Sequence, residues 1–265
     1  NVVIRGGQVL RNEGAVIWTG GFIDSSAHES ATIENVGTFS INFDASLRDI
    51  GGGGTRLFNN TGTVNRTTAT ATATLQWPFN NSGTVNVNSG ILSFAGTYTQ
   101  TAGSLVLNGG NLLFSQLIDI NGGVFTGTGS FSGTMGGTGT TTITGSVTWT
   151  SGTMQDVGIT KVAVGGTLTI SGNVVIRGGQ VLRNEGAVIW TGGFIDSSAH
   201  ESATIENVGT FSINFDASLR DIGGGGTRLF NNTGTVNRTT ATATATLQWP
   251  FNNSGTVNVN SGILS

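Results

Sequence analysis

The residues suited to acid–base or nucleophilic chemistry are few in this chain of 265 residues. His28 lies in the segment SSAHES, with Asp24 and Glu29 nearby, and occurs again as His200. A serine, a histidine and an acid are the partners of a nucleophilic hydrolase, but that site needs an activated nucleophile and a third group that orients the base. No motif in the segment marks these roles. We interpret His28 as a residue of a solvated loop and predict no catalytic residue and no enzyme activity.

The acidic residues are scattered along the chain. Polysaccharide lyases and tailspike enzymes use β-helices with coils of similar length, and their sites need charged groups clustered on one strand face. The acids considered for such a site are Asp24, Glu29, Glu34, Asp44, Asp49, Asp119 and Asp156. Asp24 and Asp156 occupy matching places in related coils, but they stand two coils apart. Polysaccharide cleavage is therefore an alternative that the spacing does not favour.

Two glycine-rich segments differ from known ion-binding loops at the residues that hold the ion. Calcium-binding solenoids repeat GGxGxD, whose aspartates are the ligands, whereas residues 136–141 read GGTGTT, with Thr141 in the aspartate position. Gly51–Gly54 lacks the Gly-Lys-Ser/Thr of a phosphate-binding loop, and Arg56 is the nearest cation. The chain also has no cysteine, which excludes disulfides and metal–thiolate sites. We predict no metal site, no cofactor and a flexible turn at Gly51–Gly54.

A repeat positions all these residues. Residues 1–93 recur without a change as residues 173–265, so the chain is about one and a half copies of a 172-residue unit. Within one unit, a glycine followed by a small and then an apolar residue recurs at a short, nearly constant spacing, which is typical of repeat architectures. These anchor glycines are Gly14, Gly37, Gly62, Gly83, Gly103, Gly123, Gly145 and Gly166. We predict a first full unit at 1–172, a partial second copy at 173–265 and no separate globular domain.

The residues after each anchor glycine alternate between apolar and polar, which predicts a half-buried strand. The predicted core columns, two and four residues after the anchor, contain Val16, Trp18, Phe39, Val64, Val85, Val87, Leu105, Leu107, Phe125, Val147, Trp149 and Leu168. Arg66 and Gly127 are exceptions in the second column. Small polar residues stand five after the anchor, and we predict that they form a ladder available for surface contacts: Thr19, Asn42, Thr67, Asn88, Asn108, Thr128, Thr150 and Ser171.

One such strand in every short repeat, with no helical periodicity between strands, leaves no room for a crossover helix. The pattern predicts an all-β fold, a right-handed parallel β-solenoid (β-helix) with one short repeat per coil, eight coils per unit and about 12 coils in all. Each coil then has a length of about 21–22 residues, within the range known for solenoid repeats. The alignment places Phe58 over Phe79 and Phe94 over Phe114. Asparagines two residues before the anchor predict a ladder of stacked amides: Asn12, Asn35, Asn60, Asn81 and Asn121.

Charge limits the classes of partner. Only 9% of the residues are charged, and the net charge is −3, with ten arginines and one lysine scattered among 14 acids. A basic footprint for nucleic acid is therefore absent. No apolar run reaches the 18 or so residues of a membrane span. The segments 22–36 and 42–58, together with their copies in the second unit, hold 14 of the 25 charged residues. These segments are longer than the others, and we expect them to bulge from the solenoid.

The segments GGTLTISGNVV (165–175) and GTVNVNSGILSFAGTYTQTAGSLVLNGGNL (83–112), together with the Asn-Gly turns, resemble bacterial surface β-solenoids of the autotransporter-passenger and filamentous-haemagglutinin type. The resemblance covers the chain through its composition and periodicity. It implies secretion and a place in a surface fibre or adhesin. It transfers no catalytic residue.

The sequence predicts a structural protein of an extracellular or cell-surface filament. Neither end of the chain has the polar cap that usually closes a solenoid, so we expect more of the same chain, or a second copy, to cover each end. The partner is then the protein itself. Alternatives are an adhesin that binds surface glycans and an ice-binding solenoid. The latter would use outward hydroxyl and amide rows such as Thr63/Asn65/Thr67 and Thr84/Asn86/Asn88.

Overall fold

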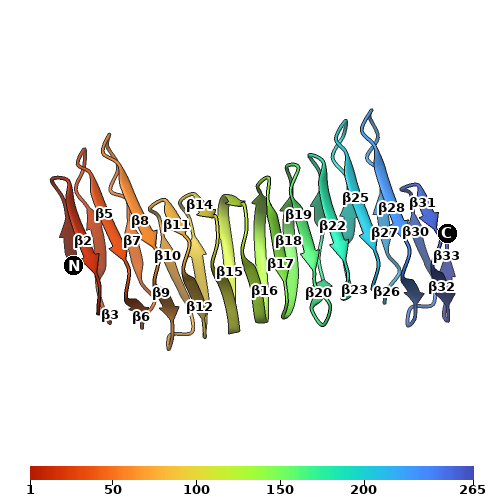
Figure 1. Ribbon diagram of the computed structural model, residues 1–265, viewed down its shortest axis with the longest axis horizontal. Coiled ribbons are helices and arrows are strands. Elements are labelled where there is room, and N and C mark those ends of the chain that lie inside the picture. Colours follow the sequence, from red (N-terminus) through yellow and green to blue (C-terminus); the bar gives the residue numbers. More distant parts are fainter. The chain divides into compact units, whose positions relative to one another are not determined.

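The computed structural model describes residues 1–265 and consists of strands and loops without a helix. The chain forms two compact units, Asn1–Ser130 (unit 1) and Phe131–Ser265 (unit 2). In each unit, successive strands stack in parallel, coil after coil (Figure 1). The all-β parallel β-solenoid predicted from the sequence is confirmed, with about 13 turns of about 21 residues where the anchor glycines predict 12.

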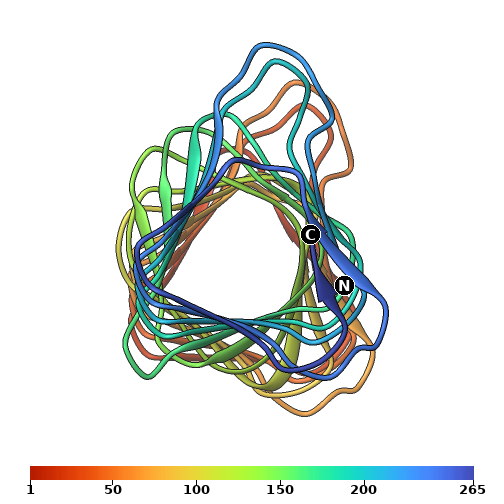
Figure 2. The same cartoon turned by 90° about the vertical axis from the view of Figure 1, so that its right-hand side faces the viewer.

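Each complete coil of unit 1 contributes three strands, and the coils wind around a roughly triangular cross-section (Figure 2). The first sheet contains β1 (Val2–Ile4), β4 (Phe22–Ser25), β7 (Ser46–Arg48), β10 (Thr72–Leu75) and β13 (Ile91–Phe94). The second contains β2 (Gln8–Asn12), β5 (Ala31–Asn35), β8 (Arg56–Asn60), β11 (Phe79–Asn81) and β14 (Tyr98–Gln100). The third contains β3 (Ala15–Trp18), β6 (Thr38–Ile41), β9 (Thr63–Arg66) and β12 (Thr84–Val87). The long strand β15 (Ser104–Ile120) turns two corners and adds to all three sheets.

Unit 2 repeats this arrangement. β18 (Ser146–Met154) belongs to two sheets, one of which continues through β20 (Thr167–Ile170), β23 (Ala187–Trp190), β26 (Thr210–Ile213), β29 (Thr235–Arg238) and β32 (Thr256–Val259). The other continues through β21 (Val174–Ile176), β24 (Phe194–Asp196), β27 (Ser218–Arg220), β30 (Thr244–Leu247) and β33 (Ile263–Leu264). The remaining sheet, which is the equivalent of the second sheet of unit 1, contains β17 (Thr140–Ile143), β19 (Ile159–Val162), β22 (Gln180–Asn184), β25 (Ala203–Asn207), β28 (Arg228–Asn232) and β31 (Phe251–Asn253). Strand β16 (Val124–Gly136) begins in unit 1 and ends in unit 2.

The register of the third sheet in unit 1 is the one that the anchor glycines predict. Val16 pairs with Phe39, Phe39 with Val64, Val64 with Val85, and Val85 with Leu105. Each partner stands at the same offset from its own anchor glycine, although the segments between anchors differ in length. Differences in coil length are therefore absorbed in the corners and loops, while the strands keep one alignment.

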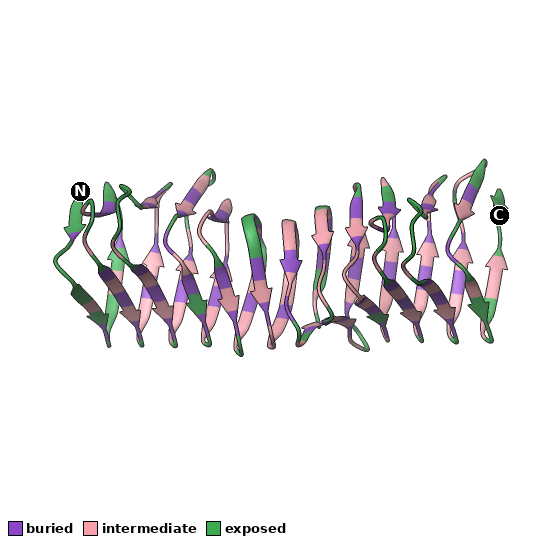
Figure 3. Cartoon of the chain, turned by 90° about the horizontal axis from the view of Figure 1, so that it is seen from above, coloured by how far each residue is buried: buried purple, intermediate pink, exposed green.

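The apolar columns form the core of each unit. Eleven of the twelve predicted core residues are buried, and Val16 is half-buried (Figure 3). The copy of Val16, Val188, is fully buried, because β23 has β20 and β26 on its two sides whereas β3 pairs with β6 alone. Complete burial of these column residues therefore requires a neighbouring coil on both sides, as Trp18 on β3 is also slightly more exposed than its copy Trp190.

Aromatic rings stack inside the core in the predicted register. Phe58 pairs with Phe79, with ring centroids 4.7 Å apart, and Phe94 lies parallel to Phe114 at 5.9 Å. Tyr98 joins this cluster at 4.7 Å from Phe94. Its burial raises the pKa of the Tyr98 phenol far above its ordinary value. Such ring pairs add to the stabilisation from burial of apolar area.

The asparagines before the anchor glycines form a buried amide ladder at one corner. Each side-chain Nδ2 donates to the Oδ1 of the next coil, from Asn12 to Asn35 (2.6 Å), Asn35 to Asn60 (2.7 Å) and Asn60 to Asn81 (2.8 Å). Asn81 then donates to Gln100 Oε1 at 3.0 Å. The second copy repeats the ladder from Asn184 through Asn207, Asn232 and Asn253. Buried polar groups are thus paired along the solenoid instead of being solvated.

We expect Asn60→Ala to lower the free energy of unfolding of its coils by about 2 kcal/mol, because it leaves the Asn35 amide without its acceptor and Asn81 without its donor. The matched control is Asn59→Ala. Asn59 is the adjacent residue, but its side chain belongs to the outward face and accepts from Asn80. Chemical denaturation of the two variants gives the comparison. Equal losses would show that the buried ladder contributes nothing beyond an exposed one.

Candidate functional surface

His28 lies on an exposed loop, where its backbone has a left-handed φ of 64°. Its backbone N–H donates to the carbonyl of Gly51 in the next coil at 3.4 Å. In the second copy, the Nδ1 atom of His200 accepts from the backbone N–H of Gly225 at 3.3 Å. No contact joins either imidazole to a serine hydroxyl or to a carboxylate. The structure therefore places the histidines at loop positions that link coils.

Asp24 is held in an ion pair. Its two carboxylate oxygens accept from Nε and Nη2 of Arg48, both at 2.7 Å, and the guanidinium lies 3.7 Å from the centre of the Phe22 ring. Asp24 and Arg48 are register partners on β4 and β7. The hydrogen bonds to Asp24 raise the pKa of Arg48 above its ordinary value. Asp196 and Arg220 repeat the pair at 2.6 Å, so Asp24 serves coil-to-coil contact.

Gly51–Gly54, for which the sequence predicts a flexible turn, surrounds a buried arginine. The Arg56 guanidinium donates to the carbonyls of Gly54 (2.6 Å), Gly52 (3.2 Å) and Gly51 (2.5 Å), and also to Ser26 of the preceding coil (3.1 Å). The loop thus presents backbone carbonyl oxygens to a cation, whereas a phosphate-binding loop presents backbone N–H groups to an anion. A glycine-rich sequence alone does not reveal which of its backbone groups converge.

Only parts of the charged segments 22–36 and 42–58 bulge from the solenoid, whereas the sequence predicted that the whole segments would. Within 22–36 and 42–58, strands β4 to β8 continue the sheets, and the longest loops between them lie near residues 26–30 and 49–55. These loops and their copies project beyond the triangular cross-section (Figure 2). They also follow the coil register, since Ala31 N donates to Thr55 O at 2.9 Å and Thr55 N to Ser30 Oγ at 3.1 Å.

Arg66, an exception in an apolar column, is fully buried. Its Nη1 donates to the carbonyl of Phe43 at 2.8 Å, and its Nη2 donates to the carbonyl of Ala71 at 3.1 Å and to Asp44 Oδ1 at 2.5 Å. Arg238 makes the same contacts with Phe215, Ala243 and Asp216. A buried arginine in place of an aliphatic residue thus fastens the loops of its own coil and of the preceding coil to the core.

In each unit, the predicted ladder residues directly follow the strand positions of the core columns, and they are half-buried or exposed. Thr67 Oγ1 donates to Asn42 Oδ1 at 2.5 Å, Asn108 Nδ2 donates to Asn88 Oδ1 at 2.8 Å, and Thr150 Oγ1 donates to the carbonyl of Phe131 at 3.1 Å. Thr19, Thr128 and Ser171 are exposed. In the outward rows proposed for ice binding, asparagine side chains of neighbouring coils bind each other, since Asn86 Nδ2 donates to Asn65 Oδ1 at 2.7 Å.

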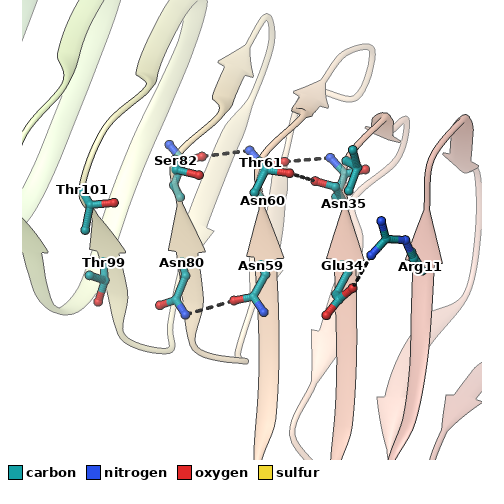
Figure 4. Close-up of a pocket in the computed structure, with 12 residues that line it drawn as sticks. Arg11, Glu34, Asn35, Asn59, Asn60, Thr61, Asn80, Ser82, Thr99 and Thr101 are labelled. Carbon is teal, nitrogen blue, oxygen red and sulfur yellow. Dashed lines mark hydrogen bonds and ion pairs between the residues drawn. The ribbon is translucent and has the colours of Figure 1, made fainter.

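A polar groove of about 600 Å³ runs over the second sheet of unit 1 (Figure 4). One row of its lining comes from the outward faces of β8, β11 and β14, namely Asn59, Asn80 and Thr99. A second row, Thr61, Ser82 and Thr101, follows the ends of these strands. A smaller groove of about 310 Å³ in unit 2 is lined by the copies of these groove residues: Asn231, Asn232, Thr233, Asn252, Asn253 and Ser254.

The outward groove residues were not predicted as a site from the sequence. The anchor alignment drew attention to strand positions after the glycine, whereas the outward groove residues precede it, by three and one positions at Gly62 and Gly83 and by four and two at Gly103. The available signal was the polar pair on either side of the buried asparagine, as in Asn59-Asn60-Thr61 and Asn80-Asn81-Ser82. Alternation around a buried asparagine predicts two outward polar side chains per coil.

Ion pairs also connect the two copies of the repeat. Lys161, the one lysine of the chain, lies in the first copy, and its Nζ is 2.7 Å from Glu185 Oε2 in the second copy. The hydrogen bond from Lys161 lowers the pKa of the Glu185 carboxyl below its ordinary value. Arg183 adds a second contact to Glu185 at 3.0 Å.

No group of three or more His, Asp or Glu side chains is arranged to hold a metal ion.

Comparisons with protein-family models, curated proteins and solved structures found no match to this chain. The structure has no helix long and apolar enough to cross a membrane.

Proposed function

We propose that the chain is a structural protein of an extracellular or cell-surface filament, in which tandem β-solenoid repeats stack coil on coil. The observation that supports this role is the junction between the two copies of the repeat, which lies inside unit 2. There the last coils of the first copy meet the first coils of the second.

The junction is an ordinary coil-to-coil contact. Strands β18, β19 and β20 of the first copy pair in parallel with β21, β22 and β23 of the second. The core columns pass through it, with Leu168 beside Val188 and Ile170 beside Trp190, all fully buried. The end of one repeat unit therefore fits the start of the next in register.

Such a repeat can be extended by adding units, since each junction reproduces the last. Every coil presents an ordered template to its neighbour, which makes nucleation costly and propagation favourable. The low content of charged residues, 9% of the chain, suits this stacking because like charges in adjacent coils would lie about 5 Å apart. Extracellular location is proposed from the resemblance of residues 83–112 and 165–175 to secreted surface solenoids.

Assembly between chains can be tested at the outer side of β3. In the second copy, Ala187 and Thr191 donate their backbone N–H groups to Gly166 and Ile170 of the preceding coil, and Ile189 between them has the same orientation. Ile17 is the copy of Ile189 and is 63% exposed. Ile17→Pro removes this donor while leaving the bonds between β3 and β6 in place.

We expect Ile17→Pro to abolish or strongly shorten the filaments that the parent chain forms, as seen by sedimentation and negative-stain electron microscopy. Ile17→Thr keeps the backbone donor and is the matched control, which should assemble like the parent. Circular dichroism of both variants verifies that the solenoid itself persists. Filaments of unchanged length from folded Ile17→Pro protein would contradict stacking at this face.

A further inference from the structure

The groove over the second sheet of unit 1 has the dimensions of a ligand site. Its volume of about 600 Å³ lies within the range of about 300–1,000 Å³ for small-molecule sites. It follows the coil direction, since its lining comes from successive strands β2, β5, β8, β11 and β14. A ligand in it would be elongated and would meet a new pair of polar side chains at each of the three coils that contain β8, β11 and β14, with Glu34 and Val36 at the coil before them.

We propose that this groove binds a neutral, extended oligosaccharide of the β-linked type. Its two outward rows, Asn59/Asn80/Thr99 and Thr61/Ser82/Thr101, end in amides and hydroxyls, which both donate and accept hydrogen bonds (Figure 4). Sugar hydroxyls have the same dual capacity. Coils are spaced by about 4.8 Å, close to the length of one residue of an extended β-linked sugar chain.

Several of these groups retain hydrogen-bonding capacity toward the groove. Asn80 Nδ2 donates to Asn59 Oδ1 at 3.0 Å, which leaves Asn80 Oδ1 and one amide hydrogen available. Thr61 Oγ1 makes a long contact of 3.4 Å with the carbonyl of Asn35. The hydroxyls of Ser82 and Thr101 are exposed and have no protein partner. The groove thus offers unused donors and acceptors in a fixed array.

The charge of the groove selects a neutral ligand. The one cation in its lining, Arg11, is already paired with Glu13 at 2.6 Å and with Glu34 at 3.2 Å. No other cation lines it, so a sulfated or phosphorylated chain would find no free counter-charge. A peptide strand is also disfavoured, because the backbone groups of β8 and β11 are already used in pairing with strands on both sides.

Binding at one groove would be weak. The lining contains no aromatic ring on which a sugar could stack, and polar contacts in an open groove exchange with water for a small net gain. The copies of the groove residues in unit 2 line a second site, so a tandem array would present the groove once per copy of the repeat. Linked sites raise the overall affinity for a long polysaccharide through effective concentration.

The test uses the 265-residue chain with cellotetraose, an extended β-linked probe, monitored by NMR shifts of the asparagine side-chain amides. We expect saturable shifts with cellotetraose and weaker ones with maltotetraose, which has the same glucose residues in a curved α-linked chain. Asn80→Ala combined with Asn252→Ala should weaken binding about tenfold, as expected when hydrogen bonds are lost at both copies. Ser82→Arg with Ser254→Arg, at exposed positions that leave the core intact, should block the groove.

The matched control is Asn86→Ala with Asn258→Ala. These asparagines have the same outward ladder contacts with Asn65 and Asn237, but they lie on another sheet, outside both grooves. The control should bind like the parent. No saturable binding of cellotetraose, equal binding of maltotetraose, or tighter binding of a sulfated heparin tetrasaccharide would overturn the inference. Oligosaccharide binding at a single groove does not require filaments. A chain that forms filaments but does not bind cellotetraose would therefore overturn only the groove inference.

Discussion

Gly83→Ala should lower the free energy of unfolding by about 3 kcal/mol or more, because it forces the stacked backbones apart. A Cβ atom at Gly83 would lie 2.1 Å from the carbonyl oxygen of Gly62 in the preceding coil. The same conflict recurs along the anchor column, at 2.1 Å for Gly37 and 2.2 Å for Gly62. Because the obstructing atom is backbone, no side-chain rotation relieves it. Close coil stacking therefore requires glycine at these three anchor positions, whereas Gly14 in the first coil meets no such conflict.

The matched control for Gly83→Ala is Gly53→Ala. Gly53 lies in the glycine-rich loop, where a Cβ atom meets nothing within 4 Å and no positive φ is needed. Thermal and urea denaturation of both variants give the comparison. We expect Gly53→Ala to be close to the parent or slightly more stable, since alanine restricts the unfolded chain. A Gly83→Ala variant as stable as Gly53→Ala would show that the coils do not approach as closely as the structure indicates.

Arg66→Ala should lower the local free energy of unfolding by about 4 kcal/mol. The substitution leaves a cavity in place of a fully buried side chain and removes the donors that hold the carbonyls of Phe43 and Ala71. Arg66→Met fills much of the volume without these donors, so it should lie between the parent and Arg66→Ala. This order separates the contribution of packing from that of hydrogen bonding.

Hydrogen exchange with mass spectrometry measures the effect of Arg66→Ala with an internal control. The substituted peptide around residue 66 differs in mass from its copy around Arg238, so both are followed in one sample. Arg238 has equivalent partners and equal burial. We expect faster exchange around residue 66 and unchanged exchange around Arg238, because a solenoid coil depends mainly on its neighbours. Equal acceleration in both peptides would contradict this local character.

Much of the fold is predictable from the sequence because the repeat displays one column of residues many times. The anchor glycines define the register of Val16, Phe39 and Val64, and that register also places Phe58 beside Phe79. The amide ladder follows from asparagine at a fixed offset. Such features need only period and residue type, both of which a sequence contains.

The features that were not predicted depend on where long side chains and loops go in three dimensions. Arg66 looks like a break in an apolar column, yet its buried guanidinium reaches backbone carbonyls of two loops. The Arg56 guanidinium likewise donates to carbonyls of a glycine-rich turn. The groove arises from the corner between strand and loop, which alternation within a strand does not describe. These elements require the path of the backbone before their partners can be named.

Coil-on-coil stacking is the central claim, and electron microscopy of the concentrated 265-residue chain, with an axial power spectrum, tests it most directly. Stacking predicts filaments with a layer line at about 4.8 Å, the spacing of paired strands along the axis. Discrete particles of single-chain length at every concentration would contradict it.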